Sequence, residues 1–437
     1  MSDQHSPAFH VPNPREVVTM KALWVWVAAV AVYIVAITGR TSFGVASVDA
    51  LERFGVSSSA IAVFTSIQVG TYAVAQIPTG VAIDKFGPRT MLVVGALIMG
   101  LGQVILGFTS TYWVAVVARI FIGAGDATAF LSVMRILPYW FPLHRTPMFT
   151  QFTGALGQLG QFISAVPFMW FLGVTGWTAA FVSLGAVGIL VALAASLAVA
   201  DSPEKVGITT PVERPNSQAL PIPQRLKLVF SSPTAWNSFF IHYTGMAPQP
   251  VFVMMWGVPL MTLGMGLSAG QAGMVLTLNT VFLILTGPLH GKLSARFSGI
   301  RDWVTLTCSI IQLACWAFFF ASPTPRGLAG VIGIMAVLAL MQPSSSYGFD
   351  KIRERMPHEV VATATGLANM GGFIAGMLGA QLMGVVLDHR GGFEWVDFQH
   401  AAWAVGWVWL AGFIGIAVTH AIEARTPRAG VRIIEVD

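Results

Sequence analysis

Long apolar stretches separated by short polar segments follow one another along most of the chain. A stretch of about 18 or more apolar residues is long enough to cross roughly 30 Å of hydrocarbon as an α-helix. The pattern predicts an all-α membrane protein with twelve spanning helices. Their expected ranges are 20–50, 57–83, 89–110, 112–137, 147–174, 177–200, 233–262, 268–291, 302–322, 326–348, 359–387 and 398–422.

A polar, proline-bearing stretch over residues 201–225 divides these helices into two sets of six. This spacing indicates two similar helical bundles joined by one linker, a layout that many secondary transporters share. The expected units are a tail (1–19), a first six-helix bundle (20–200), a linker (201–232), a second six-helix bundle (233–422) and a second tail (423–437).

Lysine and arginine are distributed unevenly between the two sets of loops. Basic residues gather in the tails, in the linker and in every second loop, whereas the remaining loops hold only Arg53, Arg326 and Arg390. Loops rich in basic residues stay on the cytoplasmic side of a membrane. The pattern predicts that both termini are cytoplasmic in a multi-pass protein of a bacterial-type inner membrane.

Composition excludes several other classes of protein. The chain is 55% hydrophobic and 10% charged, whereas soluble domains carry about a quarter charged residues. The net charge of +5 comes from the loops, so we expect no nucleic-acid partner. Cys308 and Cys315 lie in one predicted helix and are interpreted as packing residues. We find no phosphate-binding loop, zinc-ligand spacing, catalytic triad or dinucleotide fingerprint, so we expect no enzyme activity, cofactor or metal.

Three ionisable residues, Arg40, Arg119 and Asp126, lie deep inside predicted spanning helices. A charge there costs several kcal/mol or more and therefore marks a substrate or ion pathway by default. Arg119 and Asp126 are two helical turns apart, so they share a face about 10 Å apart along the axis. Arginine grips a carboxylate with two parallel hydrogen bonds, while a carboxyl group can carry a proton. The alternative is an ion pair that only fixes helix packing.

The loop after the second predicted helix contains small and charged residues at regular positions. We expect Gly80 and Gly87 to allow close helix approach, and Asp84 to accept hydrogen bonds from the start of an adjoining helix, whose dipole favours an anion. Arg89 is expected to pair with Asp84. A similar segment follows the eighth predicted helix, where Gly291 is followed four residues later by Ala295 instead of an acid. The two halves are therefore repeats of each other.

This loop resembles the signature of the major facilitator superfamily. The matching residues stand between the second and third predicted helices, and they are Gly80, Asp84, Lys85, Gly87 and Arg89. The resemblance covers the whole chain through its twelve spans, its central linker and its degenerate second copy. It implies two six-helix bundles that rock about a central cavity and bind substrate by alternating access.

The predicted helix over residues 112–137 carries Arg119 and Asp126. Together with Arg40, it resembles the anion:cation symporter branch of that superfamily. The branch includes sialin, the vesicular glutamate transporters and bacterial sugar-acid symporters. The resemblance implies that Arg40 and Arg119 contact a substrate carboxylate, that Asp126 takes the coupling proton and that Asn369 lines the cavity. The chain departs from the branch because the acid is Asp instead of the usual Glu. Gly39 also stands where some bacterial members have a second acid.

Further polar residues inside the predicted spans must be buried against protein or a watery cavity. Tyr72, Gln158, Gln161 and Gln249 are candidates for substrate binding. Cavity lining explains some of these residues and interhelical hydrogen bonds explain others, and the sequence leaves both open.

Three functions compete on these observations. The first is proton-coupled symport of a small organic anion across the lipid bilayer by a functional monomer. The second is proton-driven efflux of drugs or amphipathic metabolites, which gives no role to two arginines in the cavity. The third is a transporter-like receptor or scaffold that no longer cycles, which gives no role to the gating loop.

Overall fold

The computed structural model describes residues 13–56, 58–208 and 220–425. Within these ranges every regular element is a helix. Most of the N-terminal tail, the middle of the linker and most of the C-terminal tail expected from the sequence lie outside the described residues.

The helices of the first half run almost without interruption. They are α1 (Met20–Val45), α2 (Ser47–Phe54), α3 (Ser58–Phe86), α4 (Pro88–Phe108), α5 (Tyr112–Trp140), η1 (Leu143–Arg145), α6 (Thr146–Ile163), η2 (Ser164–Phe168) and α7 (Met169–Ala198). The predicted span over 20–50 was too long, because α1 ends at Val45 and the short α2 follows it.

The linker and the second half contain more interruptions. Their elements are η3 (Pro203–Val206), α8 (Ile222–Phe230), α9 (Pro233–Met246), α10 (Pro248–Pro250), η4 (Val251–Trp256), α11 (Gly257–Pro259), η5 (Leu260–Gly264), α12 (Ala269–Arg296), η6 (Ser298–Ile300), α13 (Arg301–Phe320), α14 (Gly327–Met341), η7 (Gln342–Ser346), α15 (Tyr347–Arg355), η8 (His358–Val360), α16 (Val361–Arg390) and α17 (Trp395–Arg425).

Among the described residues, nine helical runs are long and apolar enough to cross a membrane, and a bent run over Pro233–Gly264 raises this number to ten. One of the nine, Leu143–Ala198, has 56 residues. At 1.5 Å per residue it would be about 84 Å long, well beyond one bilayer crossing of roughly 30 Å. Gly176, with a φ of 79° and a ψ of 174°, is not helical and divides this run into two helices at a kink.

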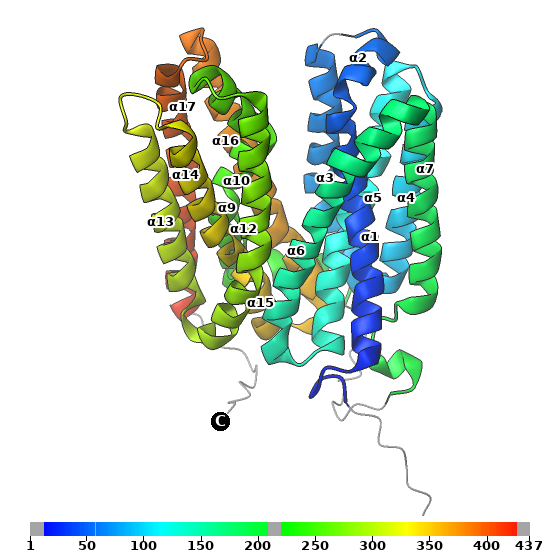
Figure 1. Ribbon diagram of the computed structural model, residues 1–437. Coiled ribbons are helices and arrows are strands. Elements are labelled where there is room, and N and C mark those ends of the chain that lie inside the picture. Colours follow the sequence, from blue (N-terminus) through cyan, green and yellow to red (C-terminus); the bar gives the residue numbers. More distant parts are fainter. Residues whose placement is uncertain (1–12, 57, 209–219, 426–437) are drawn as a thin grey trace, which may run out of the picture.

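The two halves of the chain form separate groups of helices (Figure 1). Helices α1–α7 lie on one side of the molecule and α9–α17 on the other. The groups approach each other at the end where α6 and α15 lie, and they diverge toward the end where α2 and the start of α17 lie. The most extensive contacts between the halves are those of α3 with α16 and of α6 with α12, and smaller ones join α5 to α16 and α6 to α15.

Basic residues near the end of the tenth predicted span do not lie in an exposed loop as the positive-inside pattern suggested. The helical run continues through α15, where Lys351 is 3% and Arg353 is 4% exposed. Lys351 contacts Asp302 and Glu423, with Nζ–O distances of 2.9 and 2.6 Å. These acids come from distant helices, so the sequence pattern could not indicate the burial of Lys351.

Candidate functional site

Arg40 and Asp126 form a two-pronged ion pair between α1 and α5. The Nε atom of Arg40 donates to Oδ2 of Asp126 at 2.6 Å, and Nη2 donates to Oδ1 at 2.9 Å. The Asp126 side chain is completely buried, and the Arg40 side chain is 15% exposed. The fork of the guanidinium matches both carboxylate oxygens, which is the strongest geometry for such a pair. The structure therefore joins two of the three deep charges that the sequence singled out.

Aromatic rings from both halves of the chain cover the Arg40 guanidinium. Its central carbon lies 4.4 Å from the ring centre of Tyr72 on α3 and 5.7 Å from that of Phe373 on α16. The two rings are 4.5 Å apart. A cation over a ring face is attracted by the ring quadrupole. Tyr72 was a predicted site residue, whereas Phe373 was not recognised because an apolar residue in a spanning helix gives no distinguishing signal.

Asn369 of α16 connects this cluster to α3 of the other half. Its Nδ2 donates to the hydroxyl of Tyr72 at 3.0 Å and to Oε1 of Gln76 at 2.9 Å. Asn369 is 4% exposed. The predicted cavity residue therefore lies next to the ion pair, but in this conformation its amide donor is engaged between the halves. Four predicted residues, Arg40, Tyr72, Asp126 and Asn369, come together here.

Among the described residues, the buried guanidinium of Arg119 has only part of its hydrogen-bonding capacity satisfied, although the charge of Asp126 acts on it. It is 1% exposed, and among the described residues its Nε and Nη1 have no hydrogen-bond partner. The guanidinium lies over the ring of Phe43, 4.6 Å from the ring centre. A buried cation with open donors is costly unless an anion or water completes it. The Nε and Nη1 donors of Arg119 thus have the capacity to bind a further polar or anionic group.

The three predicted glutamines lie outside the hydrogen-bonded cluster. Gln158 and Gln161 are partly buried on α6, while Gln249 is 8% exposed. At 100° per residue, Gln158 and Gln161 point about 60° apart, toward the side of α6 that also holds Gly154. A methyl group at Gly154 would meet nothing within 4 Å. In the described part of the chain, no hydrogen bond joins these glutamines to the Arg40–Asp126 pair.

Asp84, near the end of α3, contacts the first turn of α16, where the two halves meet. Its carboxylate accepts hydrogen bonds from the backbone nitrogens of Ala362 at 3.1 Å and Thr363 at 2.9 Å, and from the Thr363 hydroxyl at 2.7 Å. Helix N-termini have free N–H groups and favour anions. A methyl group at Gly80 would lie 2.6 Å from the carbonyl oxygen of Ala362. The loop thus permits the close helix approach expected of it.

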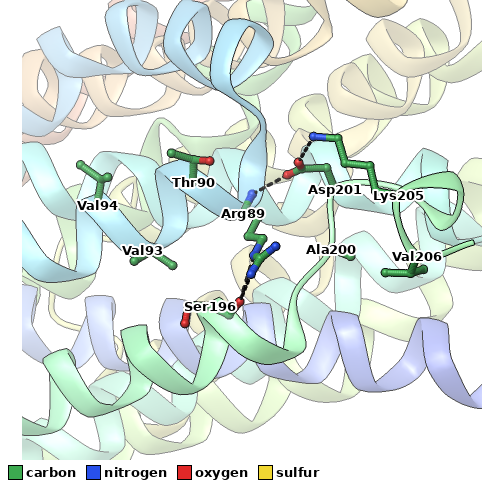
Figure 2. Close-up of a pocket in the computed structure, with 9 residues that line it drawn as sticks. All are labelled: Arg89, Thr90, Val93, Val94, Ser196, Ala200, Asp201, Lys205 and Val206. Atoms are coloured by element: carbon green, nitrogen blue, oxygen red, sulfur yellow. Dashed lines mark hydrogen bonds and ion pairs between the residues drawn. The ribbon is translucent and has the colours of Figure 1, made fainter.

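The expected pairing of Arg89 with Asp84 was wrong. The backbone nitrogen of Arg89 donates to Asp201 at 2.8 Å, and its guanidinium binds the carbonyl oxygen of Ser196. Figure 2 shows these contacts in a shallow pocket at the start of the linker, next to the pair formed by Asp201 and Lys205. Gly87 has a φ of 89°, a left-handed conformation that glycine adopts readily, and it also abuts Asp201. Arg89 and Gly87 therefore fasten the start of α4 to the end of α7 and to Asp201 of the linker.

The cation beside Asp84 is Arg135 of α5, whose Nε lies 3.3 Å from Oδ1 of Asp84. Sequence reasoning missed Arg135, although a signal was present, because it falls within a predicted span nine residues after Asp126. Its guanidinium also lies over the ring of Tyr139 at 4.7 Å. An ion pair forms between the groups that are close in space, so Arg135 of α5 lies beside Asp84 although Arg89 is nearer to it in sequence.

Among the described residues, no group of three or more His, Cys, Asp or Glu side chains has a geometry suited to a metal ion. The polar groups that meet around Arg40 are a carboxylate, a phenol and an amide. Together with Arg40, these groups can bind an anion and can transfer a proton to or from one carboxylate.

Parts of the chain are similar to known transporters. Part of the chain is 32% identical over 173 residues to a probable sulfoacetate transporter of Cupriavidus necator, covering 40% of each chain. It is 28% identical over 179 residues to a probable L-galactonate transporter of Escherichia coli, covering 41% of this chain and 39% of the relative. These matches thus span well under half the length of either relative.

A solved structure has the same fold. A bacterial homologue of the iron transporter ferroportin, in an outward-facing state, superposes with a TM-score of 0.70, covering 91% of this chain and 99% of that one at 13% identity. Residues 29–380 match the model of the Major Facilitator Superfamily, a family of transporters and not of enzymes. The helical membrane fold, the buried charges and this match lead to one conclusion: the chain belongs to the Major Facilitator Superfamily.

Proposed function

We propose that this chain is a secondary active transporter that moves a small organic anion together with protons by alternating access. The observation that carries the proposal is the buried Arg40–Asp126 pair, with Arg119 open for an anion on the same helix as Asp126. A purely structural ion pair would account for Arg40 and Asp126 but leaves Arg119 without a role. Drug efflux gives no use to two arginines, since they repel a lipophilic cation.

Competition for Arg40 couples the anion to the proton. When Asp126 is ionised, its two oxygens occupy the two donors with which Arg40 would grip a substrate. Protonation of Asp126 removes the negative charge and releases those donors. The net charge of the three residues then rises from +1 to +2, which favours a bound anion. Binding of the anion and binding of the proton therefore support each other, and linkage makes this support reciprocal.

The proposed substrate carries a carboxylate or a sulfonate group. Arginine provides planar, paired donors that suit such groups and remains charged at any physiological pH. The names of the relatives, a sulfoacetate and an L-galactonate transporter, support an organic acid as the substrate. We propose that Tyr72, Asn369 and the glutamines at 158, 161 and 249 contact the rest of the molecule.

We propose that the chain crosses the membrane twelve times. The nine candidate spans support this number when the run Leu143–Ala198 is counted as two crossings and the bent run and the 29-residue α3 are added. The proposed units are the bundles 20–200 and 233–422. Both tails and the linker 201–232 are proposed to lie on the cytoplasmic side of a bacterial inner membrane. The proposed functional unit is a monomer, because each chain contains both bundles.

In this proposal the loop with Gly80, Asp84, Gly87 and Arg89 gates the cytoplasmic side. The bonds from Asp84 to α16 can exist only while the linker ends of the halves are together. They therefore bias the equilibrium toward the state that is closed on that side. Arg89 and Gly87 act from within the first half, by holding α4 against the linker.

The test is proton uptake by liposomes that contain the purified protein and a pH dye. Sulfoacetate, L-galactonate, tartrate and simple monocarboxylates are added in turn to wild type, to Asp126→Asn and to Asp388→Asn. Asp388 is an exposed acid at the end of α16 and serves as the matched control. At least one acid should drive proton entry in wild type and in the control but not in Asp126→Asn.

Exchange of labelled substrate separates coupling from binding. Asparagine resembles the protonated carboxyl group and leaves Arg40 free, so Asp126→Asn should still exchange that acid across the membrane without a proton gradient. If no acid moves protons in wild type while lipophilic cations do, the anion proposal is refuted and proton-driven efflux replaces it.

A further inference from the structure

The repeated glycines occupy equivalent positions in the two helix pairs with the most extensive contacts between the halves, α3 with α16 and α12 with α6. A methyl group at Gly80 would lie 2.6 Å from Cα of Thr363, and one at Gly291 would lie 2.6 Å from Cα of Met148. Thr363 is the third residue of α16, and Met148 is the third residue of α6. The backbone packing at the linker end is therefore the same for α3 on α16 and for α12 on α6.

The charge at these two contacts is not repeated. Four residues after Gly80 stands Asp84, which binds the first turn of α16, but four residues after Gly291 stands Ala295. The contact between α12 and α6 thus lacks the acid that would bind the start of α6. The charged residues of α12 near this position, Lys292 and Arg296, are basic, so they cannot take the role that Asp84 has at the start of α16.

Arg353 of α15 supplies a charged contact at this second position. Its Nη2 donates to the hydroxyl of Thr150 at 2.7 Å, and its Nη1 lies 3.6 Å from the sulfur of Met134. Thr150 is on α6, half a turn beyond Met148, and Met134 is on α5. Arg353 is 4% and Thr150 is 3% exposed. A guanidinium of the second half is thus enclosed by side chains of the first.

Residues next to Ala295 hold Arg353 in place. Asp350, one turn before Arg353, forms an ion pair with it and accepts a hydrogen bond from the hydroxyl of Ser294 at 2.5 Å. Arg301 donates to the same hydroxyl at 3.0 Å and binds Glu354 through two nitrogens. The anchor of Arg353 therefore begins at the residue that precedes the missing acid.

We infer that Arg353 forms a second charged contact that holds the linker ends of the halves closed, and that it replaces the acid that the second repeat lacks. The first such contact is that of Asp84 with the start of α16. The two contacts have opposite charge, because the first half contributes the anion Asp84 and the second half contributes the cation Arg353. Each charge keeps a partner within its own half, Arg135 for Asp84 and Asp350 for Arg353. Opening therefore breaks hydrogen bonds between the halves without leaving a buried charge unpaired, which would be far more costly. The inference concerns closure and holds whatever the substrate is.

The test compares Thr150→Val with Thr307→Val. Both hydroxyls donate to a backbone carbonyl four residues earlier in their own helix, but only that of Thr150 accepts from Arg353. The difference between the two variants therefore isolates the bond across the halves. Spin labels are placed at the exposed residues His144 and Ser298, in a background in which both native cysteines are alanine.

The distance between the labels is measured by double electron–electron resonance in lipid nanodiscs without substrate. Loss of a hydrogen bond from a charged donor should shift the ratio of separated to closed linker ends by about tenfold in Thr150→Val. Thr307→Val and the conservative Thr150→Ser should keep the ratio of the parent protein. Should valine prevent folding, Thr150→Ala removes the same hydroxyl. Equal distributions in Thr150→Val and Thr307→Val overturn the inference, and so does a shift that serine fails to restore.

Discussion

Alanine in place of Gly80 should prevent the linker ends of the two halves from closing. The added methyl group would lie 2.6 Å from the Ala362 oxygen and from Cα of Thr363, whereas ordinary contacts begin at 3.4 Å. Both obstructing atoms belong to the backbone of α16, so they cannot rotate away. The two helices would have to separate by about 0.8 Å, the difference between these distances.

The size of the effect follows from this geometry. Overpacking by one methyl group costs about 1–3 kcal/mol, and here it acts only on the closed state. A separation of 0.8 Å would also stretch the bond from Asp84 to the Thr363 nitrogen from 2.9 Å to about 3.7 Å, beyond hydrogen-bond range. The ratio of closed to open molecules should fall by about 5-fold to 150-fold. The gain in helix propensity from Gly to Ala applies to both states and cancels.

The assay is the distance between labels at His144 and Ser298, which lie at the other helix pair. If the halves move as rigid bodies, a block between α3 and α16 separates these labels as well. Gly70→Ala is the matched control, because it lies on the same helix α3 and its methyl group would meet nothing within 4 Å. Gly80→Ala should shift the distribution toward separated labels and lower the rate of substrate exchange.

Equal distributions of distances in Gly80→Ala and Gly70→Ala would refute a role of the Gly80 contact in closure. Such a result would mean that the closeness of α3 and α16 at Gly80 does not affect how often the linker ends of the two halves are together. The same outcome would also remove the physical reason for a glycine at this position of the loop.

Two further changes test the binding site and the buried network of the second half. Arg40→Lys should weaken anion binding about 10-fold to 100-fold, because a lysine replaces the two-pronged grip with a single point charge. Isothermal titration calorimetry measures this affinity, with Arg326→Lys as the control variant. Equal affinities in the two variants would argue against Arg40 as a ligand of the anion. Lys351→Met should destabilise the protein by about 3–5 kcal/mol, since it strips a buried cation from two carboxylates. Thermal unfolding in detergent should show a loss of several degrees relative to the exposed Lys292→Met, and an unchanged midpoint would show that the network adds no stability.

The sequence by itself determined the helical membrane architecture and indicated Arg40 and three of the residues that meet around it, but it indicated neither Phe373 nor Arg135. A helix in hydrocarbon satisfies its backbone hydrogen bonds within itself, so its position depends on a local run of apolar residues. Arg40, Arg119 and Asp126 were visible for the same reason, because charges inside such a run stand out. The glycines of the repeated loop were also local features, whereas the contact of Asp84 with the start of α16 joins residues 278 and 279 positions apart.

Only the tertiary structure decided which of these residues meet. Asp126 binds Arg40 on another helix, although Arg119 is seven residues away on its own. Asp84 lies beside Arg135, while Arg89 turns to the linker. An ion pair depends on the separation of two charges to within an ångström, and that separation is set by how helices distant in sequence pack together, which no single stretch of residues encodes.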